Sequence, residues 1–271
     1  LAASTVGGNL SATATTGNIS DSGNLVVTGT STFITGADGS NIILDSSGNA
    51  FSKVVHLKAD TGGNETFGNI TFVDSSSVRL HGPGCGGDSC LTINAGTDGA
   101  VGGNLSVTST TGHIDQDYAL TVGGTSSFTT LANNKYIHLL GYSMSGDNAF
   151  TGAVSLNTTG SSAWARIKGG GGGTTLDVAT SSVGGYLQLH SLNGITDSGT
   201  VTVGNYLLVF TLDNNGSINL NQLAVDNFVR LVTHGTGNAT VVNDAHLKFG
   251  STGTIGGDLA ATARTGHISF G

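Results

Sequence analysis

The sequence predicts an all-β protein, and within that class a single-stranded parallel β-helix (β-solenoid) of about 13 coils. Three observations lead to this prediction: a composition that disfavours helices, short alternating apolar runs, and an internal repeat of uneven length. Of 271 residues, 45 are glycine, one is proline and one is methionine, and only 10% are charged. Glu, Lys, Gln and Met favour helices, so their scarcity favours β structure. A hydrophobic fraction of 37% argues against disorder.

The apolar residues gather in short runs such as LVVTG, NIILD and VRLHG, which are separated by turn-forming Gly, Asn, Asp and Ser. In one run, Leu10, Ala12 and Ala14 alternate with Ser11 and Thr13. A period of two places the first set on one face of a strand and the second set on the other. Small inward residues suit a narrow interior, and glycines suit corners where the backbone takes positive φ.

An internal repeat organises the chain, which we expect to form one continuous solenoid over 1–271. VGGNLSATATTGNI at 6–19 reappears as VGGNLSVTSTTGHI at 101–114, and looser copies begin near 183 and 255. The copies are unequally spaced, as insertions between coils would produce. We expect the matching leucines to stack in register as one structural ladder and the matching glycines to shape one corner. These residues are Leu10, Leu105, Leu187 and Leu259, with Gly7, Gly102, Gly184 and Gly256.

Two other all-β architectures fit the sequence less well. An antiparallel sandwich needs regular hairpins, but the only Asn-Gly pairs are Asn193-Gly194 and Asn215-Gly216. A propeller needs blades of equal length, but the copies of the repeat are unequally spaced. A solenoid tolerates insertions because each coil contacts only its neighbours.

The units VGGNLSATATTGNISDSGNLVVTGTSTF and VGGNLSVTSTTGHIDQDYALTVGGTSSF resemble the β-strand repeats of large secreted bacterial surface proteins, the filamentous-haemagglutinin-like adhesins. The resemblance covers about 6–33, 101–130, 183–204 and 255–269. It implies a right-handed parallel β-helix that is exported to the cell surface, and hence an extracellular location.

Enzymatic chemistry is not expected. Arg166-Ile167-Lys168 matches an element of polygalacturonase-like proteins, which are also parallel β-helices. Their paired aspartates and Gly-His-Gly element are missing, and hydrolysis of a glycosidic bond needs two positioned carboxylates. The eight histidines form no HxH or HxxxH pair, so we predict no metal, cofactor or catalytic residue.

Charge and cysteine usage narrow the partners and the compartment. Cys85 and Cys90 lie in the flexible segment HGPGCGGDSC, where they either close a small disulfide loop, which suits an oxidising compartment, or stay as free thiols. The nine Lys and Arg residues are scattered along a chain of net charge −8, which argues against nucleic-acid binding. No apolar run is long enough for a membrane-spanning helix.

These observations favour a structural extracellular protein. We expect a β-solenoid that builds a surface fibre or filament by end-to-end coil stacking, or a segment of a giant adhesin. Its partners would be copies of itself joined head to tail, or flanking repeats. The alternative is an adhesin module that binds a surface glycan through insertions around 131–175. A polysaccharide-active enzyme is the least favoured hypothesis.

Overall fold

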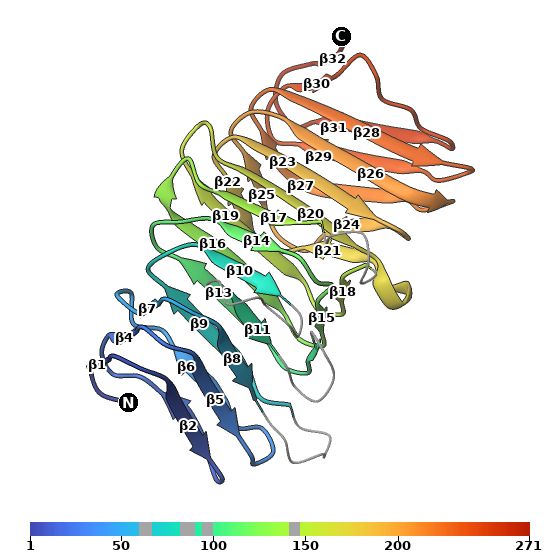
Figure 1. The fold of residues 1–271 in the computed structure, drawn as a ribbon. Helices are drawn as coiled ribbons and strands as arrows, with labels where there is room; N and C mark the ends of the chain where they lie inside the picture. The colour runs from blue at the N-terminus through green and yellow to red at the C-terminus, as the bar shows by residue number, and fades with distance from the viewer. Residues whose placement is uncertain (60–66, 82–89, 94–99, 141–146) are drawn as a thin grey trace. The chain divides into compact units, whose positions relative to one another are not determined.

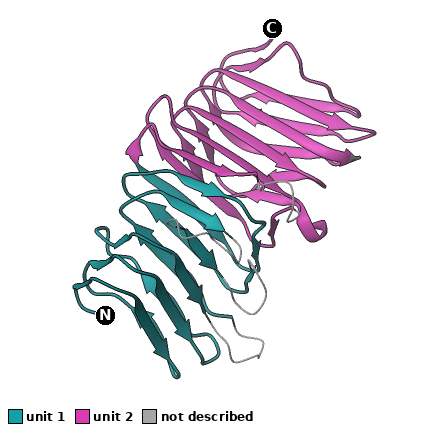
Figure 2. Cartoon of the chain, in the orientation of Figure 1, with its two compact units in different colours: residues 1–131, 141–146 teal, residues 132–140, 147–271 magenta. Residues whose placement is uncertain are grey.

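The computed structural model describes residues 1–59, 67–81, 90–93, 100–140 and 147–271. Its parallel strands stack as a β-solenoid of about 11 turns (Figure 1). The chain divides into two compact units (Figure 2): unit 1 comprises 1–131 and 141–146, and unit 2 comprises 132–140 and 147–271. The division falls inside the second copy of the repeat, not at the start of a copy.

Two parallel sheets and short corner strands build unit 1. Sheet 1A has the order β2-β5-β8-β11-β10-β14, sheet 1B has the order β3-β6-β9-β13-β16, and the corner strands form β1-β4-β7 and β12-β15. The bounds are β1 (Ser4–Val6), β2 (Leu10–Ala14), β3 (Ile19–Ser20), β4 (Leu25–Val27), β5 (Ser31–Thr35), β6 (Ile42–Leu44), β7 (Ala50–Phe51), β8 (Val55–Lys58), β9 (Ile70–Asp74), β10 (Val78–His81), β11 (Leu91–Ile93), β12 (Ala100–Val101), β13 (Leu105–Ser109), β14 (Ile114–Gln116), β15 (Thr121–Val122) and β16 (Ser126–Asn133).

Unit 2 contains two larger parallel sheets. Sheet 2A has the order β17-β20-β23-β26-β28-β30-β32, and sheet 2B contains β19, β21, β22, β24, β25, β27, β29 and β31. The bounds are β17 (Tyr136–Leu139), β18 (Ala149–Phe150), β19 (Val154–Thr159), β20 (Trp164–Gly169), η1 (Gly171–Gly173), β21 (Leu176–Val178), β22 (Ser181–Val183), β23 (Tyr186–Ser191), β24 (Ile195–Asp197), β25 (Val201–Val203), β26 (Leu207–Asn214), β27 (Ile218–Val225), β28 (Phe228–His234), β29 (Ala239–Asn243), β30 (Leu247–Phe249), β31 (Leu259–Ala263) and β32 (Ile268–Phe270).

The coils are longer than the sequence suggested, and there are therefore fewer of them than the predicted total of about 13. Hydrogen bonds between neighbouring coils join residues 20 apart at Asp258–Asn238 and 24 apart at Leu25–Asn49. In unit 1 the separation reaches 35 residues at Asn104–Asn69. Insertions thus lengthen single coils without interrupting the stack, as a solenoid allows.

The predicted alternation of inward and outward side chains is confirmed in β13. Leu105 and Val107 are at most 1% exposed, whereas Ser106 and Thr108 are only partly buried. The interior is filled mainly by Leu, Ile, Val and Phe in the described coils. Each coil contributes one residue to each row of this core, so neighbouring coils bury one another's apolar side chains.

One part of unit 1 departs from chain order. β11 pairs with β8 and β10 lies beyond it, so the later strand precedes the earlier one in sheet 1A. Leu80 of β10 is the register partner of Leu91 of β11. The segment that joins these two strands contains Cys85 and lies outside the described residues.

Candidate functional site: the outer face of sheet 2A

A row of five aromatic rings, here called the aromatic ladder, runs along the outer face of sheet 2A. Tyr136, Trp164, Tyr186, Tyr206 and Phe228 lie at, or directly before, the first residue of five successive strands of this sheet. Neighbouring ring centroids are 4.4, 5.7, 5.1 and 5.0 Å apart, and neighbouring planes lie within 10° of parallel. Parallel coils repeat at about 4.8 Å, so aromatic residues at the same rung stack face to face and turn their edges outward.

Positive charges lie beside the ladder on the same face. The Arg166 guanidinium lies 4.9 Å from the Trp164 ring centroid and 5.3 Å from that of Tyr186. Lys168, two residues further along β20 and on the same face, forms an ion pair with Asp147. Cation–π contacts of this kind contribute about 0.5–2 kcal/mol each and hold the guanidinium over the rings.

His190 lies in a third row on this face and is kept neutral by its surroundings. Burial, followed by the nearby charges of Lys168 and Arg166, lowers the pKa of His190 to about 4. The ring stacks on Phe210 at 4.8 Å, and the Gln188 amide nitrogen lies 2.6 Å from its Nε2. A neutral imidazole can accept this amide hydrogen, whereas an imidazolium cannot.

The ladder ends in a groove of about 490 Å³. Tyr206, Leu208 and Phe228 form its apolar side, and Arg230 and Lys248 form its charged side. Residues 249–252 and Gly271 complete it. The groove therefore combines aromatic surface with two cations on the outside of the solenoid.

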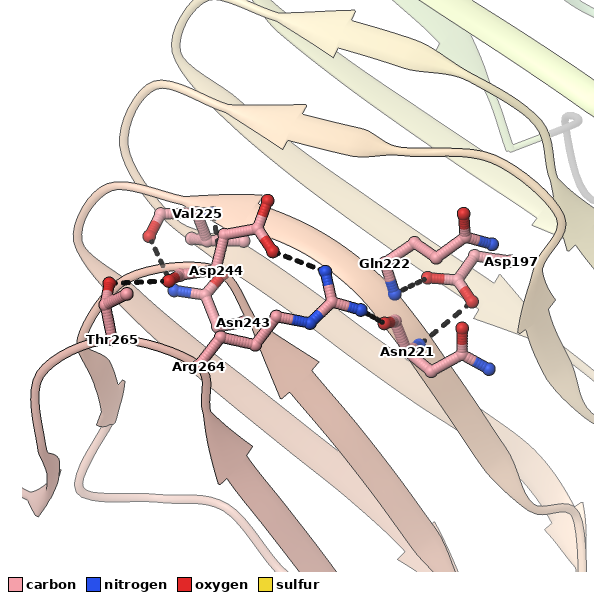
Figure 3. A network of polar contacts seen from close by, with 8 residues as sticks. All are labelled: Asp197, Asn221, Gln222, Val225, Asn243, Asp244, Arg264 and Thr265. Atoms are coloured by element: carbon pink, nitrogen blue, oxygen red, sulfur yellow. Dashed lines mark hydrogen bonds and ion pairs between the residues drawn. The ribbon is translucent and has the colours of Figure 1, made fainter.

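A corner of unit 2 carries a separate polar network (Figure 3). The Asp197 carboxylate accepts hydrogen bonds from the backbone N–H groups of Asn221 and Gln222 at 2.9 and 2.8 Å. These two residues lie at an irregularity of β27, where the register to β29 shifts between Leu220 and Leu223. The carboxylate therefore holds the bulged strand to the coil before it.

Asn243 joins the next coils of this corner from the inside. Its side chain is 1% exposed, accepts the Val225 N–H at 2.8 Å, and donates to the carbonyls of Val225 and His246 at 3.1 and 2.8 Å. Removing such a partner leaves buried groups unsatisfied, at about 1–3 kcal/mol each. The Arg264–Asp244 ion pair, also drawn in Figure 3, is about half exposed, and exposed pairs contribute about 0–1 kcal/mol. Asn243 is therefore the stronger tie.

Unit 1 uses asparagine in a comparable way, as a ladder along one corner. The Oδ1 atoms of Asn18, Asn41, Asn69 and Asn104 each accept the backbone N–H of the next coil at 2.7–2.8 Å, the last from Thr125. Each side-chain amide oxygen thus acts as the acceptor that a backbone carbonyl supplies in an ordinary turn. This explains why Asn is frequent at the turns of the sequence.

Within each unit, the structure places the two predicted ladder leucines in different sheets. In unit 1, Leu10 lies in β2 of sheet 1A and Leu105 in β13 of sheet 1B; in unit 2, Leu187 lies in β23 of sheet 2A and Leu259 in β31 of sheet 2B. They do not form one ladder. Both long sides of a coil need the same alternating pattern, so one motif can occupy either side after an insertion of uneven length.

Positive φ, the reason expected from the sequence, does not explain the four predicted corner glycines. None of Gly7, Gly102, Gly184 and Gly256 has a positive φ. A Cβ on Gly184 would instead lie 2.4 Å from the carbonyl oxygen of Gly160 in the neighbouring coil, and a Cβ on Gly7 would have no neighbour within 4 Å. Close coil-to-coil approach, not left-handed backbone, thus explains the inner glycines.

The remaining sequence expectations fall on other parts of the structure. Cys90 is 3% exposed and disulfide-bonded, while Cys85 lies outside the described residues. Arg166 and Lys168 point outward from β20, and Ile167 points into the core. The described part of the stretch 131–175 forms the end of β16, the strands β17, β18, β19 and β20, and the 3₁₀ turn η1.

The described residues provide no cluster for a metal and no helix for a membrane. Among them, His, Cys, Asp and Glu side chains form no group of three or more that could hold an ion. No helix in this part of the chain has the length and apolar character needed to cross a bilayer.

Sequence analysis missed the aromatic ladder. Its signal is the recurrence of one aromatic residue at the start of an alternating run about once per coil, from Tyr136 to Phe228. The charged row was also missed, because residues one coil apart are about 20 positions apart in sequence and therefore form no local pattern.

Residues 1–58 and 87–157 match the family model "Repeats of unknown function (DUF5649)". The two DUF5649 stretches contain the first two copies of the VGG motif, and of the aromatic ladder they contain Tyr136 alone. No curated protein and no solved structure matches the chain. The DUF5649 match therefore supports a repeat protein and leaves the function to be argued from the structure.

Proposed function

We propose that the chain is a structural extracellular protein, a β-solenoid that serves as part of a surface fibre or adhesin stalk by stacking its end coils on further coils. The observation that supports this proposal is the apolar end surface of unit 2. Phe270 is 73% exposed, and Leu259 and Ile268 are each 39% exposed. Phe270 and Leu259 line a hollow of about 220 Å³ together with Phe249 and Ile255.

In the preceding coil, the residues that match Phe270 and Leu259 are buried. Phe249 is 7% exposed because Phe270 stacks on it at 5.1 Å, and Ala239 is 1% exposed beneath Leu259. A further coil would bury Phe270 and Leu259 in the same way and would pair with the edge strands β31 and β32. At the other end, Leu1 is 45% exposed beside Ala12 and Ile19. The covering coil comes from a second copy or from flanking repeats.

Sedimentation velocity of the 271-residue chain over a range of concentrations tests this proposal. We expect concentration-dependent association and, in fibres drawn from the associated protein, an axial X-ray reflection at about 4.8 Å. Phe270→Asp should abolish the association. Leu131→Asp is the matched control, since Leu131 is 54% exposed in unit 1 away from the end coils. Single chains at every concentration, or equal effects of both variants, would contradict stacking between copies.

Catalysis forms no part of this proposal. The Asp197 carboxylate serves as a structural acceptor, and the Asp147 carboxylate is an ion-pair partner of Lys168. A reducing-sugar assay on acidic and neutral polysaccharides checks this expectation, and turnover by the wild-type chain would oppose it.

A further inference from the structure

Beyond this structural role, we propose that the outer face of sheet 2A binds a linear carboxylated polysaccharide, a uronic-acid polymer. The groove between Phe228, Arg230 and Lys248 is the centre of this site. Neither the repeat motif nor the stacking function requires aromatic or charged side chains on this face.

Positive charge gathers on this face. The chain has nine Lys and Arg residues and a net charge of −8. Arg166, Lys168, Arg230 and Lys248 nevertheless all lie on sheet 2A, and only Lys168 has an ion-pair partner among the described residues. A positive face on an otherwise acidic protein favours a negatively charged ligand.

Two contacts hold Arg230 in place. Its guanidinium lies 5.4 Å from the Phe210 ring centroid, and its Nε donates to the Thr252 carbonyl at 3.1 Å. No hydrogen bond from its terminal Nη groups is present within the described part of the chain. An ordered guanidinium with free donors is suited to a planar carboxylate, which it can bind with two hydrogen bonds. Lys248 adds a second cation on the same side of the groove.

The stacking of the ladder rings favours a sugar polymer over a nucleic acid. Bases bind to free aromatic faces, but the ladder rings are 4.4 to 5.7 Å apart and cover one another. What the ladder offers outward is ring edges and, beside the groove, the hydroxyl of Tyr206. Hydroxyl-rich chains can hydrogen-bond to such edges. Side chains also recur here once per coil, about every 4.8 Å, close to the repeat of an extended 1,4-linked pyranose chain.

Calorimetric titration with polygalacturonate of defined length tests the proposal, with the fully methyl-esterified polymer as the neutral probe of the same backbone. We expect binding of the acid form, weakened by added salt, and little binding of the ester. Arg230→Gln with Lys248→Gln should weaken binding about tenfold or more, since hydrogen bonds to charged groups contribute about 1.5–3 kcal/mol. Lys53→Gln with Lys58→Gln removes the same charge from unit 1 and should leave the affinity within about twofold.

Several results would overturn the proposal. Equal binding of the ester would show that carboxylates are not read. Equal losses in both double variants would show that only net charge matters. If a second copy of the chain, and not the polymer, occupies the face, the site is an interface between copies. Absence of binding by a folded wild-type chain would also refute it. Lys248→Gln alone, at an exposed position, keeps the test valid if the double variant fails to fold, and sedimentation of the same variants tests coil stacking separately.

Discussion

At the scale of single residues, His190 shows what an outward position on a crowded β-solenoid face does to a side chain. Its ring is stacked on Phe210 and lies near two cations, so the charged form loses water and meets like charge. The folded chain therefore holds a neutral histidine on a face that is otherwise positive. The charge available to an anionic ligand comes from Arg and Lys, and does not change near neutral pH.

The depressed pKa of His190 makes stability depend on pH in a defined window. Above its ordinary value of 6.5 both folded and unfolded chains are neutral at this residue. Between 6.5 and about 4 the unfolded chain gains a proton that the folded chain does not, so the free energy of unfolding falls as the pH falls. As the pH is lowered through this window, we expect the melting temperature of His190→Gln, measured by circular dichroism, to fall less than that of wild type. Parallel pH profiles would contradict the assignment.

At the scale of elements, the glycines beside the short strands set how closely two coils approach. Gly184 follows β22, and the position of its missing Cβ is already occupied by the Gly160 carbonyl. A methyl group there must push one coil away from the next. The cost extends to the parallel hydrogen bonds on either side of the contact, because these depend on the same spacing.

Gly184→Ala and Gly7→Ala form a matched pair that isolates this effect. Gly184→Ala should destabilise the chain by about 1–3 kcal/mol, as overpacking does. Gly7→Ala meets nothing within 4 Å and should be neutral, or slightly stabilising through the unfolded state. Urea denaturation of both variants measures the difference. Equal destabilisation would show that chain flexibility, and not coil contact, explains the glycines.

Strands and their inward faces could be predicted from the sequence because the alternation is local, as Leu105, Val107 and Ser109 illustrate. The assignment of a strand to a sheet could not, because Leu10 and Leu105 have equal surroundings in sequence and lie in different sheets. The candidate site was missed for a related reason. Arg166 and Arg230 belong to one face only after the register between distant coils is known, and no local pattern contains that register.

At the scale of the whole molecule, stability is the sum of many neighbouring contacts between coils, and no single centre dominates. Each coil buries the one before it, and insertions leave the contacts of the remaining strands intact. Such a molecule can lengthen by adding coils without redesign of its interior. The exposed apolar surface of the last described coil is the same kind of surface that buries every inner coil.

A charge inside one coil tests this additive picture in unit 1. Leu105 is 1% exposed and has Ile70 and Ser126 as register partners. Leu105→Asp should destabilise the protein by about 3 kcal/mol or more, because an unpaired carboxylate is buried. Thr108→Ser on the outward side of the same strand should change stability by less than about 0.5 kcal/mol. Thermal melting of both variants checks this, and equal shifts would contradict the inward and outward assignment.

The single tryptophan of the chain is a rung of the aromatic ladder, between Tyr136 and Tyr186. Light absorbed by either tyrosine therefore has an acceptor one coil away, at centroid distances of 4.4 and 5.7 Å. The coil spacing of unit 2 thus has its own optical signal: tyrosine emission is quenched while the rungs are stacked, and returns when they separate. A solenoid of this kind can report its own unwinding, or a pull along its axis, without any added dye.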